Sequence, residues 1–147
     1  MLRRLLLCSS FVVVSGLMAC DDESIVAPSS LACYTLTLGA WNAPLPETLP
    51  PPPLALQLTD SLGTQILENG RRVVRSLPAG SAKAYPFQFW EAREGGDVLI
   101  VFSNGFTGMT MDLVPAAGNY SGTARAFFDF GTFDLSAPVQ LTRNTCG

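Results

Sequence analysis

The sequence contains no histidine. Histidine is the commonest general base and the commonest nitrogen ligand for metals, so its absence excludes every Ser/His or Cys/His catalytic arrangement. The single lysine, Lys83, follows Ser81 by two residues, which is a spacing that a serine–lysine dyad could use. Pro and Gly residues surround this pair and favour an exposed loop, in which lysine stays protonated. We therefore expect no catalytic residue there.

Charged residues are few: nine basic and twelve acidic in 147 residues. Two basic residues, Arg3 and Arg4, lie in a segment assigned below to a cleaved leader, which leaves seven basic and twelve acidic residues, a net charge of −5. Nucleic-acid phosphates select surfaces rich in Lys and Arg. The sequence therefore predicts no nucleic-acid partner.

Two further groups of residues could take part in acid/base catalysis or in metal binding. Acidic residues flank predicted turns in two pairs, Glu91 with Glu94 and Asp129 with Asp134. We interpret these carboxylates as solvated charges and not as an acid/base pair of the kind that glycosidases use. Met109 and Met111 could bind copper, but without histidine they favour core packing. We thus expect a non-enzymatic protein without metal or cofactor.

Residues 1–19 have the three-part pattern of a secretory signal peptide. Arg3 and Arg4 come first, and an uncharged stretch of 15 residues runs from Leu5 to small residues near Ala19. A transmembrane helix needs about 20 apolar residues. The pattern therefore predicts cleavage in preference to a permanent membrane span.

The leader ends in Leu17-Met18-Ala19-Cys20, which resembles the lipobox of bacterial lipoproteins. The resemblance implies cleavage between Ala19 and Cys20 and a diacylglycerol on the Cys20 sulfur, with acylation of the new amino terminus. Two or more acyl chains anchor a protein stably where one does not. The alternative is an ordinary secretory leader. In enteric bacteria, Asp at the next position resembles an inner-membrane retention signal. That rule is not general across bacteria, so the sequence does not decide between the inner and the outer membrane.

The chain after the leader divides into a tether at residues 20–32 and one domain at residues 33–147. The tether is polar and contains Pro28, so it should hold the domain away from the lipid surface. These boundaries predict a cell-envelope protein, lipid-anchored to a membrane through Cys20, with its domain facing the periplasm or the exterior.

Of the four cysteines, Cys8 lies in the leader and Cys20 is the predicted lipid site. Cys33 and Cys146 are then the only pair left in an oxidising compartment, and we predict a disulfide between them. Cys33 opens the first strand-like run and Cys146 is the penultimate residue, so the bond would join the two ends of the domain. Two free thiols or intermolecular pairing are the alternatives.

The domain has a period-two pattern of apolar residues typical of half-buried strands. Gly, Asn and Pro turn signals separate the segments. The predicted strands are Tyr34 to Leu38, Leu54 to Thr59, Val73 to Leu77, Tyr85 to Glu91, Asp97 to Ser103, Gly108 to Val114, Tyr120 to Phe128 and Thr132 to Thr142. Residues 60–77 could instead hold one short helix. We predict an all-β fold, an antiparallel meander of about eight strands forming a small barrel or a sandwich.

Two features of the first connection bear on function. Four consecutive prolines, residues 50–53, predict a stiff polyproline II loop and not a ligand for a signalling domain. Gly39-Ala40-Trp41 resembles the Gly-x-Trp element of lipocalins, which implies a lipocalin-like barrel shape.

Aromatic residues occur on several predicted strands and loops: Trp41, Tyr85, Phe87, Phe89, Trp90, Phe102, Phe106, Tyr120, Phe127, Phe128, Phe130 and Phe133. They either line a cavity for a small hydrophobic ligand or fill a narrow barrel. The first case predicts a ligand-binding module and the second favours a structural or assembly role through the outer surface, with an envelope protein as partner. A void of roughly 300 Å³ or more lined by these aromatics would favour ligand binding.

Overall fold

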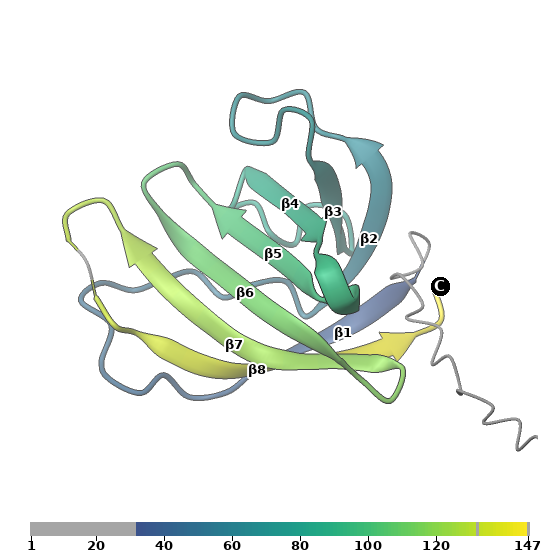
Figure 1. Ribbon diagram of the computed structural model, residues 1–147. Coiled ribbons are helices and arrows are strands. Elements are labelled where there is room, and N and C mark those ends of the chain that lie inside the picture. The colour runs from purple at the N-terminus through teal and green to yellow at the C-terminus, as the bar shows by residue number, and fades with distance from the viewer. Residues whose placement is uncertain (1–31, 132, 147) are drawn as a thin grey trace, which may run out of the picture.

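The alternating sequence folds into antiparallel strands that close into one barrel (Figure 1). The computed structural model describes residues 32–131 and 133–146. Within them the strands are β1 (Cys33–Leu38), β2 (Ala55–Leu62), β3 (Arg72–Leu77), β4 (Phe87–Ala92), β5 (Val98–Ser103), β6 (Thr107–Ala116), β7 (Asn119–Phe128) and β8 (Ser136–Asn144). A turn of 3₁₀ helix, η1 (Glu94–Gly96), connects β4 to β5.

Each strand pairs with the next along the chain, and β8 returns to pair with β1. The closing register runs from Cys33 opposite Asn144 to Leu38 opposite Val139. The predicted all-β antiparallel meander is therefore confirmed, and of its two forms the barrel is the one observed. Closure leaves a sheet without free outer edges along most of its circumference, which protects the backbone from edge-to-edge association.

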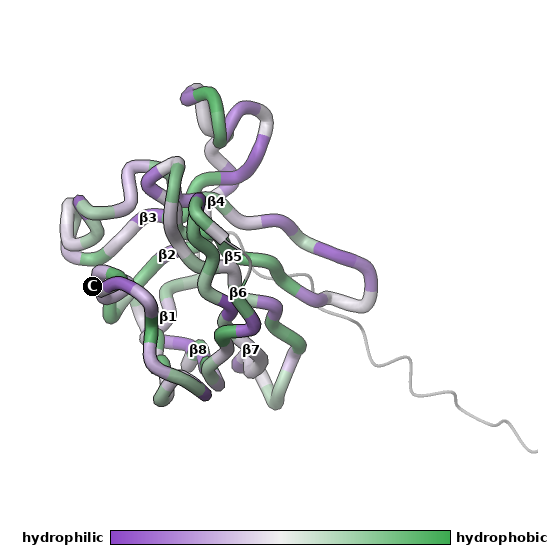
Figure 2. Tube along the Cα trace, turned by 90° about the vertical axis from the view of Figure 1, so that its left-hand side faces the viewer, coloured by the Kyte–Doolittle hydropathy of each residue, from purple (hydrophilic) through white to green (hydrophobic). Residues whose placement is uncertain are grey.

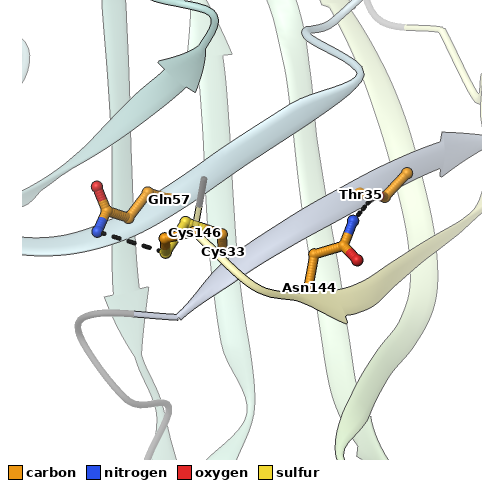
Figure 3. Close-up of a disulfide and its surroundings, with 5 residues drawn as sticks. All are labelled: Cys33, Thr35, Gln57, Asn144 and Cys146. Atoms are coloured by element: carbon orange, nitrogen blue, oxygen red, sulfur yellow. Dashed lines mark hydrogen bonds between the residues drawn. A yellow bond between two sulfur atoms is a disulfide. The ribbon is translucent and has the colours of Figure 1, made fainter.

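The disulfide joins the start of β1 to the segment that follows β8, beside this closing pair (Figure 3). Cys33 and Cys146 are bonded with their Cα atoms 5.2 Å apart, which confirms the predicted pairing. Asn144 Nδ2 donates to Thr35 Oγ1 at 2.6 Å in the same region. Because the bond closes a sequence separation of 113 residues, it stabilises the fold by about 4 to 5 kcal/mol in the chain-entropy model.

Side chains from the inner face of the sheet fill the part of the barrel between β4, β5 and β6. The Trp90 indole donates to the Thr59 carbonyl at 2.8 Å, so this buried ring leaves no unpaired donor. Buried and exposed residues alternate along β8, whereas β5 is hydrophobic at five successive positions; Figure 2 colours the chain by hydropathy. The largest fully buried side chains are Trp90, Tyr85, Phe102, Leu56, Leu58, Ile100, Met109, Met111, Leu113, Leu141, Val98 and Val139.

Met109 and Met111 lie opposite Phe102 and Ile100 in the register of β5 and β6. Both methionines are buried, which confirms their prediction as core residues. Their flexible thioethers fill irregular space between branched and aromatic neighbours.

Several predicted strand limits were wrong. Leu54 was predicted to be the first inward residue of the second strand, but it precedes β2 and is 76% exposed. The fourth strand begins at Phe87 and not at Tyr85, because Pro86 has no N–H to give to a ladder. The last begins at Ser136 and not at Thr132. Residues 60–77 form the end of β2, a turn and β3, and not a helix.

No helix in the described ranges is long and apolar enough to cross a bilayer.

Candidate functional site

The ladder between β1 and β2 stops before β1 ends. Its last bond runs from the N–H of Leu36 to the carbonyl of Leu54, at 2.7 Å. Continued by two residues, the register of this pair would place Pro52 opposite Leu38. Proline has no N–H and a fixed φ, so it cannot extend the ladder. The proline segment, residues 50–53, therefore leaves the sheet, and β2 begins only at Ala55.

A cavity of about 590 Å³ occupies the gap that opens between β1 and the proline segment. We call it the β1 cleft. Its lining is Thr35, Leu36, Thr37, Leu38, Trp41, Leu49, Pro50, Pro51, Pro52, Leu54 and Met109. None of these described residues is charged, and the threonine hydroxyls are the only polar side-chain groups among them besides the Trp41 indole. The cleft is thus an apolar site on a protein of net negative charge.

The β1 cleft extends from solvent into the barrel. Leu54 lies at its outer margin, and Met109 of β6 lies on the inner face of the sheet with 1% of its surface exposed. The cleft therefore reaches from an exposed rim to a core side chain contributed by another part of the barrel. An elongated or branched apolar group could be removed from water along this path.

The outer wall of the cleft is held by Tyr85, which is fully buried in the connection between β3 and β4. Its hydroxyl donates a hydrogen bond to the carbonyl of Pro50, and its ring packs against Phe102 with centroids 5.8 Å apart. Burial raises the pKa of Tyr85 to about 12. The proline segment is therefore fixed to the core by a neutral phenol.

Trp41 is placed at the cleft by its neighbour Asn42. The Asn42 N–H donates to the Ser136 carbonyl at 2.8 Å, and Asn42 Oδ1 accepts from the Ser136 N–H at 2.9 Å. Asn42 Nδ2 also donates to the Asp134 carbonyl at 3.1 Å. These bonds fasten the start of the long β1–β2 connection to the start of β8.

Gly39 lies against β8 in the same connection. Its N–H donates to the Pro138 carbonyl at 2.8 Å, and a Cβ added at Gly39 would lie 2.6 Å from Pro138 Cγ. Any side chain would collide with this ring, so close approach to β8 explains why glycine is needed before Trp41.

The predicted aromatic residues divide between the core, the exposed surface and the cleft, and five of them, Tyr85, Trp90, Phe102, Tyr120 and Phe128, belong to the hydrophobic core. Trp41 is the member of the predicted set that lines the β1 cleft. Phe89 is covered by the guanidinium of Arg71, 4.3 Å from the ring centroid. The rest of the lining consists mainly of leucines and prolines, which the sequence analysis did not predict. The proline run beside a predicted strand was the one feature of the sequence that could have indicated this site.

Other aromatics form an exposed group at the connection between β7 and β8. Phe130 lies 5.5 Å from Phe128 and 5.8 Å from Phe133 between ring centroids. Phe130 is 61% exposed although it packs on both neighbours. Phe106, on the turn between β5 and β6, is 67% exposed. The register of Thr107 with Phe128 brings these two turns to the same end of the barrel.

The remaining candidate residues lie away from the β1 cleft lining. Ser81 and Lys83 are exposed in the connection between β3 and β4. Glu91 forms an ion pair with Arg71 at 3.0 Å, and Asp129 and Asp134 are exposed beside the β7–β8 turn. The predicted cleavage and lipid sites, Ala19 and Cys20, lie outside the described residues.

Comparison with known proteins gives no match for this chain among protein-family models, curated proteins or solved structures.

We predict that Tyr85 makes the fold sensitive to alkaline pH. Its pKa of about 12 in the folded protein exceeds the ordinary value of 10.0, so its stabilising contribution is complete below pH 10 and is lost as the pH rises through 12. This difference of two pKa units corresponds to roughly 2 to 3 kcal/mol in the free energy of unfolding. Urea unfolding between pH 8 and 12 should show a clearly smaller decline for Tyr85→Phe than for the wild type.

Some decline should persist in that variant, because burial also raises the pKa values of Tyr34 and Tyr120. Equal pH profiles for the wild type and Tyr85→Phe would contradict the assignment of the alkaline effect to Tyr85.

Proposed function

We propose that this chain is a membrane-anchored lipoprotein of the bacterial cell envelope whose barrel binds a small hydrophobic ligand, without catalysis. The observation that carries the ligand-binding part is the β1 cleft, with about 590 Å³ of space and an uncharged, mainly apolar lining. Ligand sites typically have volumes of about 300 to 1,000 Å³ and apolar walls with a few polar groups. The cleft has these properties, although leucine and proline supply most of the lining in place of aromatics.

Preformed walls support this proposal. The Tyr85–Pro50 bond fixes the proline segment, and the bonds of Asn42 fix the start of the β1–β2 connection, which carries Trp41. Four successive prolines have little conformational freedom of their own. A ligand would therefore lose little of its binding free energy to ordering of the protein.

The anchoring part of the proposal depends on the lipobox at Cys20 and on the residues that separate it from the barrel. Twelve residues, from Asp21 to Ala32, can span at most about 40 Å when extended. That reach allows the barrel to stand clear of a membrane surface. The Cys33–Cys146 disulfide supports export, because such bonds persist in oxidising compartments.

A second function is favoured by the exposed aromatic residues Phe106 and Phe130 at one end of the barrel. Exposed aromatic groups of this kind are enriched in protein–protein interfaces. They support the structural or assembly role through the outer surface, with an envelope protein as partner. Neither phenylalanine lines the β1 cleft, so variants at the two places separate the two functions.

The ligand-binding proposal predicts saturable binding of a neutral hydrophobic fluorophore, N-phenyl-1-naphthylamine, by the purified barrel. Leu54→Asp should weaken this binding at least tenfold, because it places a carboxylate at the rim of an apolar cleft. Leu62→Asp is the matched control. Leu62 is also an exposed leucine, at 61%, but lies at the opposite end of β2 from the cleft.

Fluorescence titration of the wild type and both variants gives the three dissociation constants. Absence of saturable binding by the wild type, or equal weakening by the two substitutions, would overturn the assignment of the β1 cleft as a ligand site.

The anchoring proposal predicts that Cys20 carries the lipid. Metabolic labelling with radioactive palmitate in a bacterial host should label the wild type, and Cys20→Ala should lose the label. Cys8→Ala is the control, since Cys8 lies in the predicted leader and should leave labelling intact. Label that persists in Cys20→Ala would exclude Cys20 as the anchor.

A further inference from the structure

The β1 cleft lies at the edge of β1 and not on one of its faces. Its lining includes four consecutive residues of the strand, Thr35 to Leu38. Successive side chains of a strand point to opposite sides of the sheet, so a ligand on one face would contact every second residue. Here residues from both faces of β1 line the cleft. The open space therefore lies within the plane of the sheet, in the position that a neighbouring strand would occupy.

This edge presents a backbone donor and acceptor to the cleft. The N–H of Gly39 bonds to Pro138 on the β8 side, and Leu38 is in register with Val139. In an antiparallel pair, bonding to one neighbour alternates along the strand, so the N–H and carbonyl of Leu38 point away from β8 and toward the cleft. Within the described residues, no strand pairs with β1 there, because the opposite position is Pro52.

The side chains around the gap differ on its two sides. Leu36 and Leu38 belong to the inner face of β1, and Met109 lies deeper on the same side. Thr35 and Thr37 belong to the outer face. An extended occupant matches both sides if its inward side chains are apolar, while its outward side chains can be of several kinds. The absence of charge among these described residues favours an uncharged occupant.

We propose that the ligand of the β1 cleft is an extended, uncharged apolar peptide segment that adds to the edge of β1 as a strand. The peptide residue opposite Leu38 would exchange two backbone hydrogen bonds with it and direct its side chain inward toward Met109. This is the β-strand addition by which other proteins bind extended peptides. An acyl chain has the apolar surface but no donor for the Leu38 carbonyl. The inference rests on the proposed function, since it names the ligand class of the same site.

The test uses the chain from residue 21 onward with its disulfide formed, because residues 32–146 contain the complete closed barrel and its core. The capped peptide acetyl-Val-Leu-Val-amide should displace bound N-phenyl-1-naphthylamine. N-methylation of its central leucine removes the donor to Leu38 and should weaken displacement at least tenfold. N-methylation of the first valine is the matched control, since that N–H points away from β1 and its loss should have little effect.

Hydrogen exchange of the Leu38 amide, measured by NMR, gives an independent readout. The peptide should slow this exchange severalfold, whereas decanol should displace the fluorophore without slowing it. Displacement by decanol but not by the peptide, or equal effects of the two N-methylations, would overturn the peptide assignment and leave the hydrophobic site standing.

Failure of the fluorophore itself to bind is the separate result that overturns the proposed function. Peptide binding that emerges only when residues 21–31 are removed would also overturn the inference, because it would make that segment of the chain the native occupant.

Discussion

The four prolines at residues 50–53 cannot donate backbone hydrogen bonds, and this limit decides how the barrel is built around β1. On one side, β1 pairs with β8 along its whole length, and the Cys33–Cys146 disulfide reinforces that junction. On the other, its pairing with β2 ends at the bond between Leu36 and Leu54. β1 is therefore paired along the whole of one edge but only as far as Leu36 on the other.

The open edge has an energetic consequence. A buried N–H or carbonyl without a partner costs roughly 1 to 3 kcal/mol, and water in an open cleft can avoid that cost. A ligand that replaces this water must supply the hydrogen bonds as well as apolar surface. The missing N–H groups of the prolines thus open the cleft and also favour a peptide ligand, which brings backbone donors and acceptors.

Stability and binding are placed in different parts of the barrel. The interior between β4, β5 and β6 is filled by large side chains such as Trp90 and Phe102. The β1 cleft lies where the chain is held by individual hydrogen bonds between residues distant in the sequence, from Tyr85 to Pro50 and between Asn42 and Ser136. Substitutions at the cleft rim can therefore change binding without removing core contacts.

The sequence was sufficient to predict features that depend on a local residue pattern, such as the strands, or on the exclusion of other pairings, such as the disulfide. Period-two alternation predicted the strands, and the fates of Cys8 and Cys20 left Cys33 and Cys146 as a pair, which the structure bonds. The meander order was predicted from the turn signals that separate successive strand-like segments.

The β1 cleft could not be predicted, because it depends on a register between distant residues. Only the pairing of β1 with β2 places Pro52 opposite Leu38. Leu54 continues the alternation of β2 in the sequence, yet it follows Pro53 and lies outside the strand. Phe89 is buried on the outer face because Arg71, on another strand connection, covers it, which alternation within β4 does not reveal.

The most direct test of this account gives the proline segment the backbone donors that it lacks. Pro52→Val combined with Pro53→Thr would allow β2 to extend along β1. We expect slower hydrogen exchange of the Leu38 amide in this double variant and at least tenfold weaker binding of N-phenyl-1-naphthylamine. Unchanged Leu38 exchange together with unchanged binding would contradict the claim that the prolines hold the β1 cleft open.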